Sequence, residues 1–169
     1  LGLSPAIRER VAALVRTQIL DRGASRVAVM TLPDASVAPG FTGLDATSRG
    51  LLSSLSAAFN TTLLAALDGS GARIIDVRAL NAAVMASPAT YGLTNVTQSA
   101  CDPARVSAIT GGRITDGSSL FCNGAAASAF VAPVPNLNTL RTGASASTWL
   151  FADSVHPTTG GHRILADQV

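Results

Sequence analysis

Residues 26–32 read RVAVMTL, a short and almost continuously apolar run that is rich in β-branched side chains. Gly23 precedes this run, and Pro33 and Asp34 end it. Such a run predicts a strand that is buried on both faces, as in a parallel sheet. Residues 73–77, RIIDV, form a second run of the same kind. Together the two runs predict the strands of an α/β fold.

Helical periodicity flanks both runs. Apolar residues recur at helical spacing from Pro5 onwards, and Gly23 is the expected cap at the end of that helix. A second helical stripe begins after Asp45 or Thr47, either of which can serve as its N-cap, and it continues to Leu67. Helix, strand, helix and strand therefore follow one another, an order that is typical of α/β folds with right-handed parallel crossovers.

The second half of the chain carries fewer signals. We expect a short helix over residues 79–85, an extended run over residues 149–152, and a last helix over residues 158–169 that is capped by one of its first threonines. No strong periodicity occurs between residues 87 and 147. Only two convincing buried strands are predicted, and a two-stranded parallel sheet leaves both of its edges open. The sequence thus predicts part of an α/β domain.

The composition limits the classes of protein to consider. The chain has 169 residues, which suits one domain, and 47% of them are hydrophobic whereas 13% are charged. This balance, with a formal net charge of +2, argues against a disordered chain. All twelve basic residues are scattered arginines, so we expect no nucleic-acid partner. The longest apolar stretches fall short of the ~20 residues that a membrane span needs, so we expect no transmembrane segment.

The chain has two cysteines, Cys101 and Cys122, in a stretch rich in Gly, Ser, Ala and Asp. An even count in loop-like sequence favours one disulfide, and hence an oxidising compartment. Two buried free thiols are the alternative. A zinc site is disfavoured because no histidine lies near either cysteine and the spacing is not that of such a site.

A second pair of residues suggests acid–base chemistry. Asp153 precedes His156 by three positions, in a turn that Pro157 restricts. In such a turn the carboxylate can accept a hydrogen bond from one imidazole nitrogen, which leaves the other nitrogen free to act as a base. The alternative is an aspartate that caps a helix beside a surface histidine. The D-x-x-H spacing alone does not decide between these interpretations.

The surroundings of this pair resemble a known family. Residues 149–167, WLFADSVHPTTGGHRILAD, are similar to the final conserved block of the GDSL or SGNH family of serine esterases and lipases, where D-x-x-H-P-[ST] is followed by x-x-G-H. The similarity is greatest to autotransporter-type and related secreted bacterial lipases, which carry a cysteine pair where Cys101 and Cys122 lie. Further stretches with family-like motifs cover nearly the whole chain: residues 27–34 (VAVMTLPD), Phe59-Asn60 with Leu63 and Leu67, residues 73–80, and residues 88–95 (PATYGLTN).

The resemblance implies a three-layer αβα, flavodoxin-like fold, with residues 1–169 as the C-terminal part of a single domain. It implies that His156 is the catalytic base and Asp153 the acid that orients it. The reaction would be hydrolysis of a carboxyl ester through a serine acyl-enzyme. It further implies a secreted, periplasmic or cell-surface location, and it requires no cofactor and no metal.

The chain departs from the family in lacking a nucleophile motif. The family carries its serine in G-D-S and an oxyanion-hole asparagine in G-x-N-D, and neither motif occurs here. Residues 68–70 and 116–118 read D-G-S, which is the wrong order and is better explained by turns. We therefore expect the serine, with the oxyanion Gly and Asn, to lie on another chain that carries G-D-S or in a missing N-terminal part, with Leu1 as a break point in a longer precursor. We also expect an apolar partner over a strand edge.

Two other functions remain open. A non-catalytic hydrolase-like module for binding or assembly is favoured by the missing nucleophile, although Asp153 and His156 are both present. A metal-dependent hydrolase could use His156 with His162 and Asp167, but two histidines and no zinc motif disfavour it. For His162, a hydrogen bond from its helix to the preceding loop is the simpler interpretation.

Several further residues have both a functional and a structural interpretation. Asp34 follows a strand at its carboxyl end, where α/β proteins bind ligands, but it can equally cap the next turn. Asp76 is expected to accept backbone hydrogen bonds, and Arg78 to be solvated. The candidates to line an acyl pocket, or else to pack in the core or a loop, are Tyr91, Asn95 and Trp149.

Overall fold

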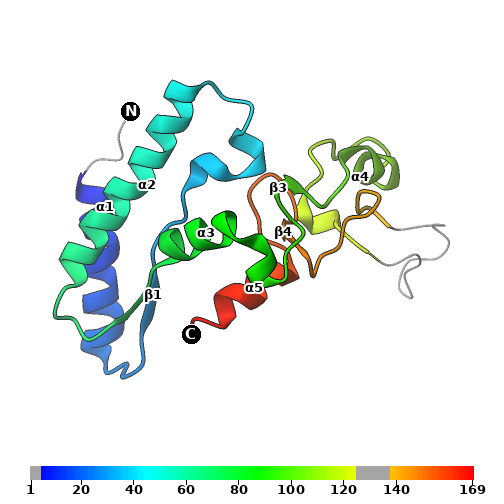
Figure 1. The fold of residues 1–169 in the computed structure, drawn as a ribbon. Helices are drawn as coiled ribbons and strands as arrows, with labels where there is room; N and C mark the ends of the chain where they lie inside the picture. The colour runs from blue at the N-terminus through cyan, green and yellow to red at the C-terminus, as the bar shows by residue number, and fades with distance from the viewer. Residues whose placement is uncertain (1–4, 125–137) are drawn as a thin grey trace. The chain divides into compact units, whose positions relative to one another are not determined.

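The computed structural model describes residues 5–124 and 138–169, and these residues form a mixed α/β fold with short parallel strands (Figure 1). The chain divides into two compact units. The first comprises Leu1–Ser36, Leu44–Ala83 and Gln168–Val169, and the second comprises Val37–Gly43 and Val84–Asp167.

The first unit is built from helices that pack on a pair of strands. Its elements are α1 (Pro5–Leu14), β1 (Ala28–Met30), α2 (Ala46–Leu67), β2 (Arg73–Ile75) and the greater part of α3 (Val77–Ala86). The helices α1 and α2 lie side by side (Figure 1). Between them Ala12, Leu63 and Leu67 form a buried cluster, against which Val29 and Phe59 pack. The expected order of helix, strand, helix and strand is confirmed.

The ends of these helices follow from local sequence. After α1 the chain continues as a π-helical turn (Val15–Ile19) and a 3₁₀ turn (Leu20–Arg22), and it stops at Gly23, whose φ of +93° suits glycine. Asp45, rather than Thr47, caps α2, because its carboxylate accepts a hydrogen bond from the Ser48 backbone N–H at 3.0 Å.

The two strands pair in parallel, with Ala28 opposite Arg73 and Met30 opposite Ile75. The prediction that the first strand is buried on both faces is wrong for this chain. Met30 is 45% exposed and Leu32 is 42% exposed, and on β2 Ile74 is 36% exposed. The physical reason is that only two strands pair in the described part of this unit, so no further strand or helix covers these side chains. Ile74 is paired with Val29, so it and Met30 lie on opposite faces, and each face of the strand pair keeps an exposed apolar side chain.

Helix α2 bears on the expectation that the chain has no transmembrane segment. Its 22 residues have a mean hydropathy of 1.4 in the most apolar window, which is long and apolar enough to cross a membrane by length and composition. That expectation rests on uninterrupted apolar stretches, which fall short of the ~20 residues that a membrane span needs. Core helices of soluble proteins pass the same test. In this chain α2 packs on α1 and on the end of β1.

One side chain of α2 ties the helix to the end of β1. The Asn60 carboxamide accepts a hydrogen bond from the Leu32 backbone N–H at 2.8 Å and donates one to the Leu32 carbonyl at 2.8 Å. Asn60 is only 6% exposed. It therefore satisfies both backbone groups of a residue that lies beyond the paired part of the strand. This contact explains why an asparagine stands inside an apolar helix.

We expect Asn60→Ala to lower the free energy of unfolding by about 1–2 kcal/mol, because it leaves the N–H and C=O of Leu32 without their partner. Urea denaturation followed by circular dichroism measures the change. Thr61→Ala is the matched control, since the Thr61 hydroxyl is exposed and bonds only within the helix. It should change the stability by less than ~0.5 kcal/mol. Equal effects of the two substitutions would contradict the assigned role of Asn60.

The second unit contains another pair of parallel strands. Its regular elements are β3 (Asn95–Ser99), α4 (Pro103–Ile109), β4 (Trp149–Phe151) and α5 (Thr159–Ala166), with 3₁₀ turns at Pro39–Phe41, Pro88–Tyr91 and Ser119–Phe121. Strand β3 pairs with β4, with Asn95 opposite Trp149 and Ser99 opposite Phe151 across an irregularity. The core of this unit is a cluster of Ala100, Leu140 and Trp149.

The sequence predicted part of this unit. Strand β4 and helix α5 are confirmed, and Thr158 caps α5 by accepting a hydrogen bond from the Gly161 N–H. Strand β3 and helix α4 were missed. The sequence of β3, NVTQS, is mostly polar and has no apolar periodicity. Helix α4 does carry a local signal, because Asp102 caps it and Pro103 occupies its first position.

Candidate active site

Asp153 and His156 lie on a tight loop between β4 and α5. The chain turns back on itself there, since the Ala152 N–H donates to the His156 carbonyl at 2.8 Å and the Thr158 N–H donates to the Leu150 carbonyl at 2.9 Å. Phe151 and Pro157 form an antiparallel bridge across the same loop. Strand β4 before the loop and the N-terminal cap of helix α5 after it therefore hold residues 153–156 in place.

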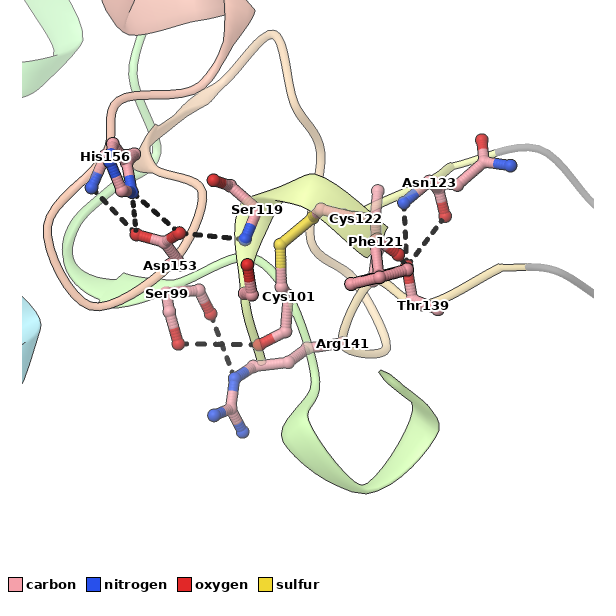
Figure 2. The surroundings of a disulfide bond; sticks show 12 residues. Ser99, Cys101, Ser119, Phe121, Cys122, Asn123, Thr139, Arg141, Asp153 and His156 are labelled. Atoms are coloured by element: carbon pink, nitrogen blue, oxygen red, sulfur yellow. Dashed lines mark hydrogen bonds and ion pairs between the residues drawn. A yellow bond between two sulfur atoms is a disulfide. The ribbon is translucent and has the colours of Figure 1, made fainter. Parts of the chain in front are cut away.

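The Asp153 carboxylate is buried and receives hydrogen bonds from two directions. Its side chain is 5% exposed. Oδ1 accepts from the backbone N–H groups of Val155 at 3.0 Å and of His156 at 2.8 Å. Oδ2 accepts from the Ser119 backbone N–H at 2.8 Å and lies 2.9 Å from Nδ1 of His156. Figure 2 shows the carboxylate between the imidazole and Ser119.

These contacts keep the carboxylate ionised. Burial by itself raises the pKa of Asp153, but the hydrogen bonds from His156, Val155 and Ser119 outweigh it and hold the pKa well below its ordinary value. An ionised carboxylate can only accept hydrogen bonds, so Nδ1 of His156 must carry the proton that points at it. Asp153 thus selects the tautomer of His156.

The lowered pKa of Asp153 predicts how stability depends on pH. Since the folded-state pKa lies below the unfolded-state pKa, the stabilisation is complete above the unfolded value of ~3.9 and is lost as pH falls towards the folded value. We expect the free energy of unfolding of the wild type to fall below about pH 5, and Asp153→Asn to flatten that fall. Urea denaturation from pH 7 to pH 2.5 measures both curves.

The control for this titration is Asp21→Asn, which alters a carboxyl on an exposed 3₁₀ turn. Its stability curve should run parallel to that of the wild type. The interpretation would be wrong if Asp153→Asn kept the full acid dependence of the wild type.

The second imidazole nitrogen of His156 is available. The His156 side chain is 65% exposed, and Nε2 makes no hydrogen bond to the residues that the structure describes. With the proton on Nδ1, Nε2 carries the free lone pair. The pair can therefore take a proton from a donor that approaches Nε2, while the buried carboxylate stabilises the resulting imidazolium. The predicted pairing of Asp153 with His156 is present in the structure.

A glycine that the sequence did not single out supports this loop. The Gly40 N–H donates to the Ser154 carbonyl at 2.8 Å, and a Cβ at position 40 would lie 2.9 Å from the Cβ of Ser154. Any larger residue must push the loop away. The two residues are far apart in sequence, so no local pattern could have indicated this contact.

The expected disulfide is confirmed, and it lies beside Asp153 and His156. Cys101 and Cys122 are bonded, with their Cα atoms 5.5 Å apart (Figure 2). A disulfide is compatible with an oxidising compartment. The 3₁₀ turn Ser119–Phe121 comes directly before Cys122, and its first residue donates to Asp153. Ser119 is a residue of the site that the sequence did not indicate.

A cavity of about 360 Å³ borders the two histidines. Its volume lies within the ~300–1,000 Å³ that is usual for small-molecule sites. Its walls are mostly small or apolar, and the hydroxyls of Thr158 and Thr159 are already bonded to backbone carbonyls. The residues that line the cavity include Ala100, Ser119, Cys122, Ala152, His156 and His162. The cavity therefore suits an uncharged, apolar group beside the imidazoles.

The other candidate residues from the sequence are characterised by where they lie and what they contact. His162 is exposed and lines the same cavity as His156, and within residues 5–124 and 138–169 no three His, Cys, Asp or Glu side chains gather as a metal site would require. Trp149 is part of the core. The Asn95 side chain accepts from the N–H groups of Thr97 and Gln98, and it does not line the cavity. The backbone carbonyl of Tyr91 accepts from Arg163.

In the first unit, polar residues at the carboxyl ends of β1 and β2 bond to one another. Asp34 accepts from the backbone N–H of Ser36 and forms an ion pair with Arg78 at 3.0 Å. Asp76 accepts from the Ala79 N–H and from the Thr31 hydroxyl. The structural interpretations of Asp34 and Asp76 are therefore confirmed. The expectation that Arg78 is solvated is wrong, because its guanidinium is held by Asp34 and by Ser53.

Comparison of the chain with protein-family models and with curated proteins finds no match to either.

Proposed function

We propose that this chain supplies the base and the orienting acid of a secreted serine hydrolase that cleaves carboxyl esters. The observation that supports it is the Asp153–His156 pair: a buried, ionised carboxylate holds Nδ1, and Nε2 is left exposed. This is the arrangement a serine hydrolase requires of its histidine. The resemblance of residues 149–167 to the last block of the GDSL family supports the same reaction and a three-layer αβα domain.

In the proposed mechanism Nε2 of His156 removes the proton from a serine hydroxyl, which attacks the ester carbonyl. The imidazolium then gives this proton to the departing alcohol, and an acyl-enzyme remains. Water attacks the acyl-enzyme with His156 again as the base, which releases the acid and restores the serine. Asp153 keeps its negative charge throughout and stabilises the imidazolium.

The nucleophile would come from a companion polypeptide that carries G-D-S, together with the oxyanion Gly and Asn, because these 169 residues contain no such motif. The exposed apolar side chains of Met30 and Leu32, at the end of β1, support such a partner. Burial of these side chains against an apolar strand would stabilise the assembly by ~25 cal/mol for each Å² of apolar surface removed from water.

The cavity beside His156 would receive one side of the ester. Its small apolar walls, Ala100 and Ala152 among them, suit an uncharged group better than a charged one.

A fluorophosphonate probe tests the proposed function in the native sample, with any polypeptide that copurifies. Such probes react with an activated serine, which displaces fluoride from phosphorus. We expect intact-mass analysis to show the label on a companion chain with G-D-S, and His156→Ala to abolish labelling. Asp167→Asn is the control, since its carboxylate is 64% exposed and pairs only with Arg163; labelling should persist. Absence of labelling in the wild type, or full labelling in His156→Ala, would instead favour the non-catalytic binding module.

A further inference from the structure

The Asp153 carboxylate depends on one hydrogen-bond donor from outside its own loop. The donors from Val155 and His156 lie within three residues of Asp153, and both bond to Oδ1. Oδ2 accepts from Nδ1 of His156 and from the Ser119 N–H, which is 34 positions away in sequence. Ser119 lies on the opposite side of the carboxylate from the imidazole (Figure 2). Ser119 thus adds a donor on Oδ2 from outside the loop, while Nδ1 of His156 lies 2.9 Å from Oδ2 and 3.0 Å from Oδ1.

The disulfide connects the turn that carries Ser119 to the backbone beneath Asp153. Cys122 directly follows this turn, and its partner Cys101 is fully buried. The Cys101 N–H donates to the carbonyl of Ala152, the residue before Asp153, at 2.8 Å. The S–S bond thus joins the segment below the carboxylate to the turn that donates to it.

We propose that the Cys101–Cys122 disulfide and the Ser119 amide are positioning elements of the catalytic pair: the disulfide holds the Ser119 N–H on Oδ2 of Asp153, and the carboxylate thereby keeps His156 as its Nδ1–H tautomer. The importance of this role for catalysis rests on the proposed function. The contact between the Ser119 N–H and Oδ2 of Asp153 does not, so it can be tested on the chain alone.

Other anchors of the turn do not replace the disulfide. The buried Thr139 hydroxyl donates to the Phe121 carbonyl at 2.8 Å and accepts from the Asn123 N–H at 2.7 Å. These bonds hold the end of the turn, two and four residues beyond Ser119. On the other side, Gly117, with a φ of +69°, lies in the segment that leads into the turn. The Thr139 bonds hold the neighbours of Cys122 and not Ser119 itself, so we expect loss of the S–S bond to loosen Ser119 while Thr139 remains bonded.

The test is nitrogen-15 NMR of the two imidazole nitrogens of His156 in the isolated chain, together with hydrogen exchange of the Ser119 amide. Ser119→Pro removes the N–H and keeps the disulfide. The backbone tolerates this change, because Ser119 is the first residue of the turn and Ser118 has an extended ψ of 134°. Ser119→Ala separates the two groups of this residue, since it removes the hydroxyl, which also lowers the pKa of Asp153, and keeps the N–H.

The disulfide is tested by the double substitution Cys101→Val and Cys122→Ala, in which valine fills the buried site of Cys101. We expect neutral His156 to be mainly the Nδ1–H tautomer in the wild type and in Ser119→Ala. In Ser119→Pro and in the double variant the Nε2–H tautomer, which free imidazole side chains favour, should predominate. In the double variant the Ser119 amide should exchange up to about tenfold faster, as for the loss of one hydrogen bond.

Two results would overturn the proposal: an unchanged tautomer in Ser119→Pro, or unchanged Ser119 exchange in the folded double variant. Val106→Ala is a further control, because it weakens the same unit at a fully buried site away from the carboxylate. A shift of the tautomer in Val106→Ala as well would show a general loss of packing and would also refute the specific role.

If the double variant does not fold, the wild type is compared before and after treatment with a dithiol. The dithiol supplies two electrons and two protons, which give two cysteine thiols, and is itself oxidised to a cyclic disulfide. Unchanged exchange at Ser119 after reduction would then overturn the proposal. Because no ester is present in any of these measurements, their outcome is independent of the fluorophosphonate labelling that tests the proposed function.

Discussion

If the chain acts as proposed, Asp153→Asn should lower the rate of ester hydrolysis about 10⁴-fold in the assembly of this chain with the polypeptide that carries the nucleophile. The carboxylate accepts the hydrogen bond from Nδ1 of His156 at 2.9 Å, and hydrogen bonds from the backbone of His156 and Val155 and from the side chain and backbone of Ser119 keep it ionised. An asparagine can present its NH₂ group to Nδ1, which then becomes an acceptor and places the proton on Nε2. The imidazole would then face the serine with a proton instead of a lone pair.

The measurement is kcat with a small activated ester, such as p-nitrophenyl acetate, for the chain with its companion polypeptide. Asp167→Asn should retain the wild-type rate, because Asp167 caps the far end of α5 and its ion pair with Arg163 is exposed. If Asp153→Asn kept more than about a tenth of the wild-type kcat, Asp153 would not be the orienting acid of a serine hydrolase.

Loss of the disulfide should produce the largest change in stability. The bond closes a loop between positions that are 21 apart, and removing such a link lowers the free energy of unfolding by ~3 kcal/mol in the chain-entropy account. We expect this loss in the Cys101→Val, Cys122→Ala variant, measured by urea denaturation at pH 7. Cys101 is buried beside the core cluster of Ala100, Leu140 and Trp149, so imperfect packing of the valine that replaces it would lower the free energy of unfolding further.

Reduction of the wild type provides the matched comparison. A dithiol should shift the urea midpoint of the wild type towards that of the double variant and should leave the midpoint of the double variant in place. Equal midpoints for oxidised and reduced wild type would show that the bond does not stabilise the fold.

Interactions between neighbours in sequence could be predicted from the residues. The pairing of Asp153 with His156 needs only a spacing of three residues in a turn, and both partners lie on one loop. The cap of α5 by Thr158 and the stop of the first helix at Gly23 are also local. Two cysteines in a loop-rich stretch indicated their own pairing. The resemblance of the final block supplied roles for the catalytic pair, and these roles remain predictions.

Contacts between distant segments could not be predicted in this way. Nothing near Ser119 indicates that its amide reaches Asp153, and nothing near Asn60 indicates that it binds Leu32, 28 positions away. Strand β3 has a polar sequence and is a strand because β4 lies beside it. The apolar run over residues 26–32 suggested a strand buried on both faces, but burial depends on what covers the strand.

The residues alone were thus enough to predict the helices and strands with strong periodicity, their caps, the disulfide and the D-x-x-H pair, because each depends on side chains a few positions apart or on the count of one residue type. Only the tertiary structure decided which donors keep Asp153 ionised, that Gly40 supports its loop, and that Met30 and Ile74 are exposed. Those features depend on the path of the whole chain, which brings together groups that no local pattern connects.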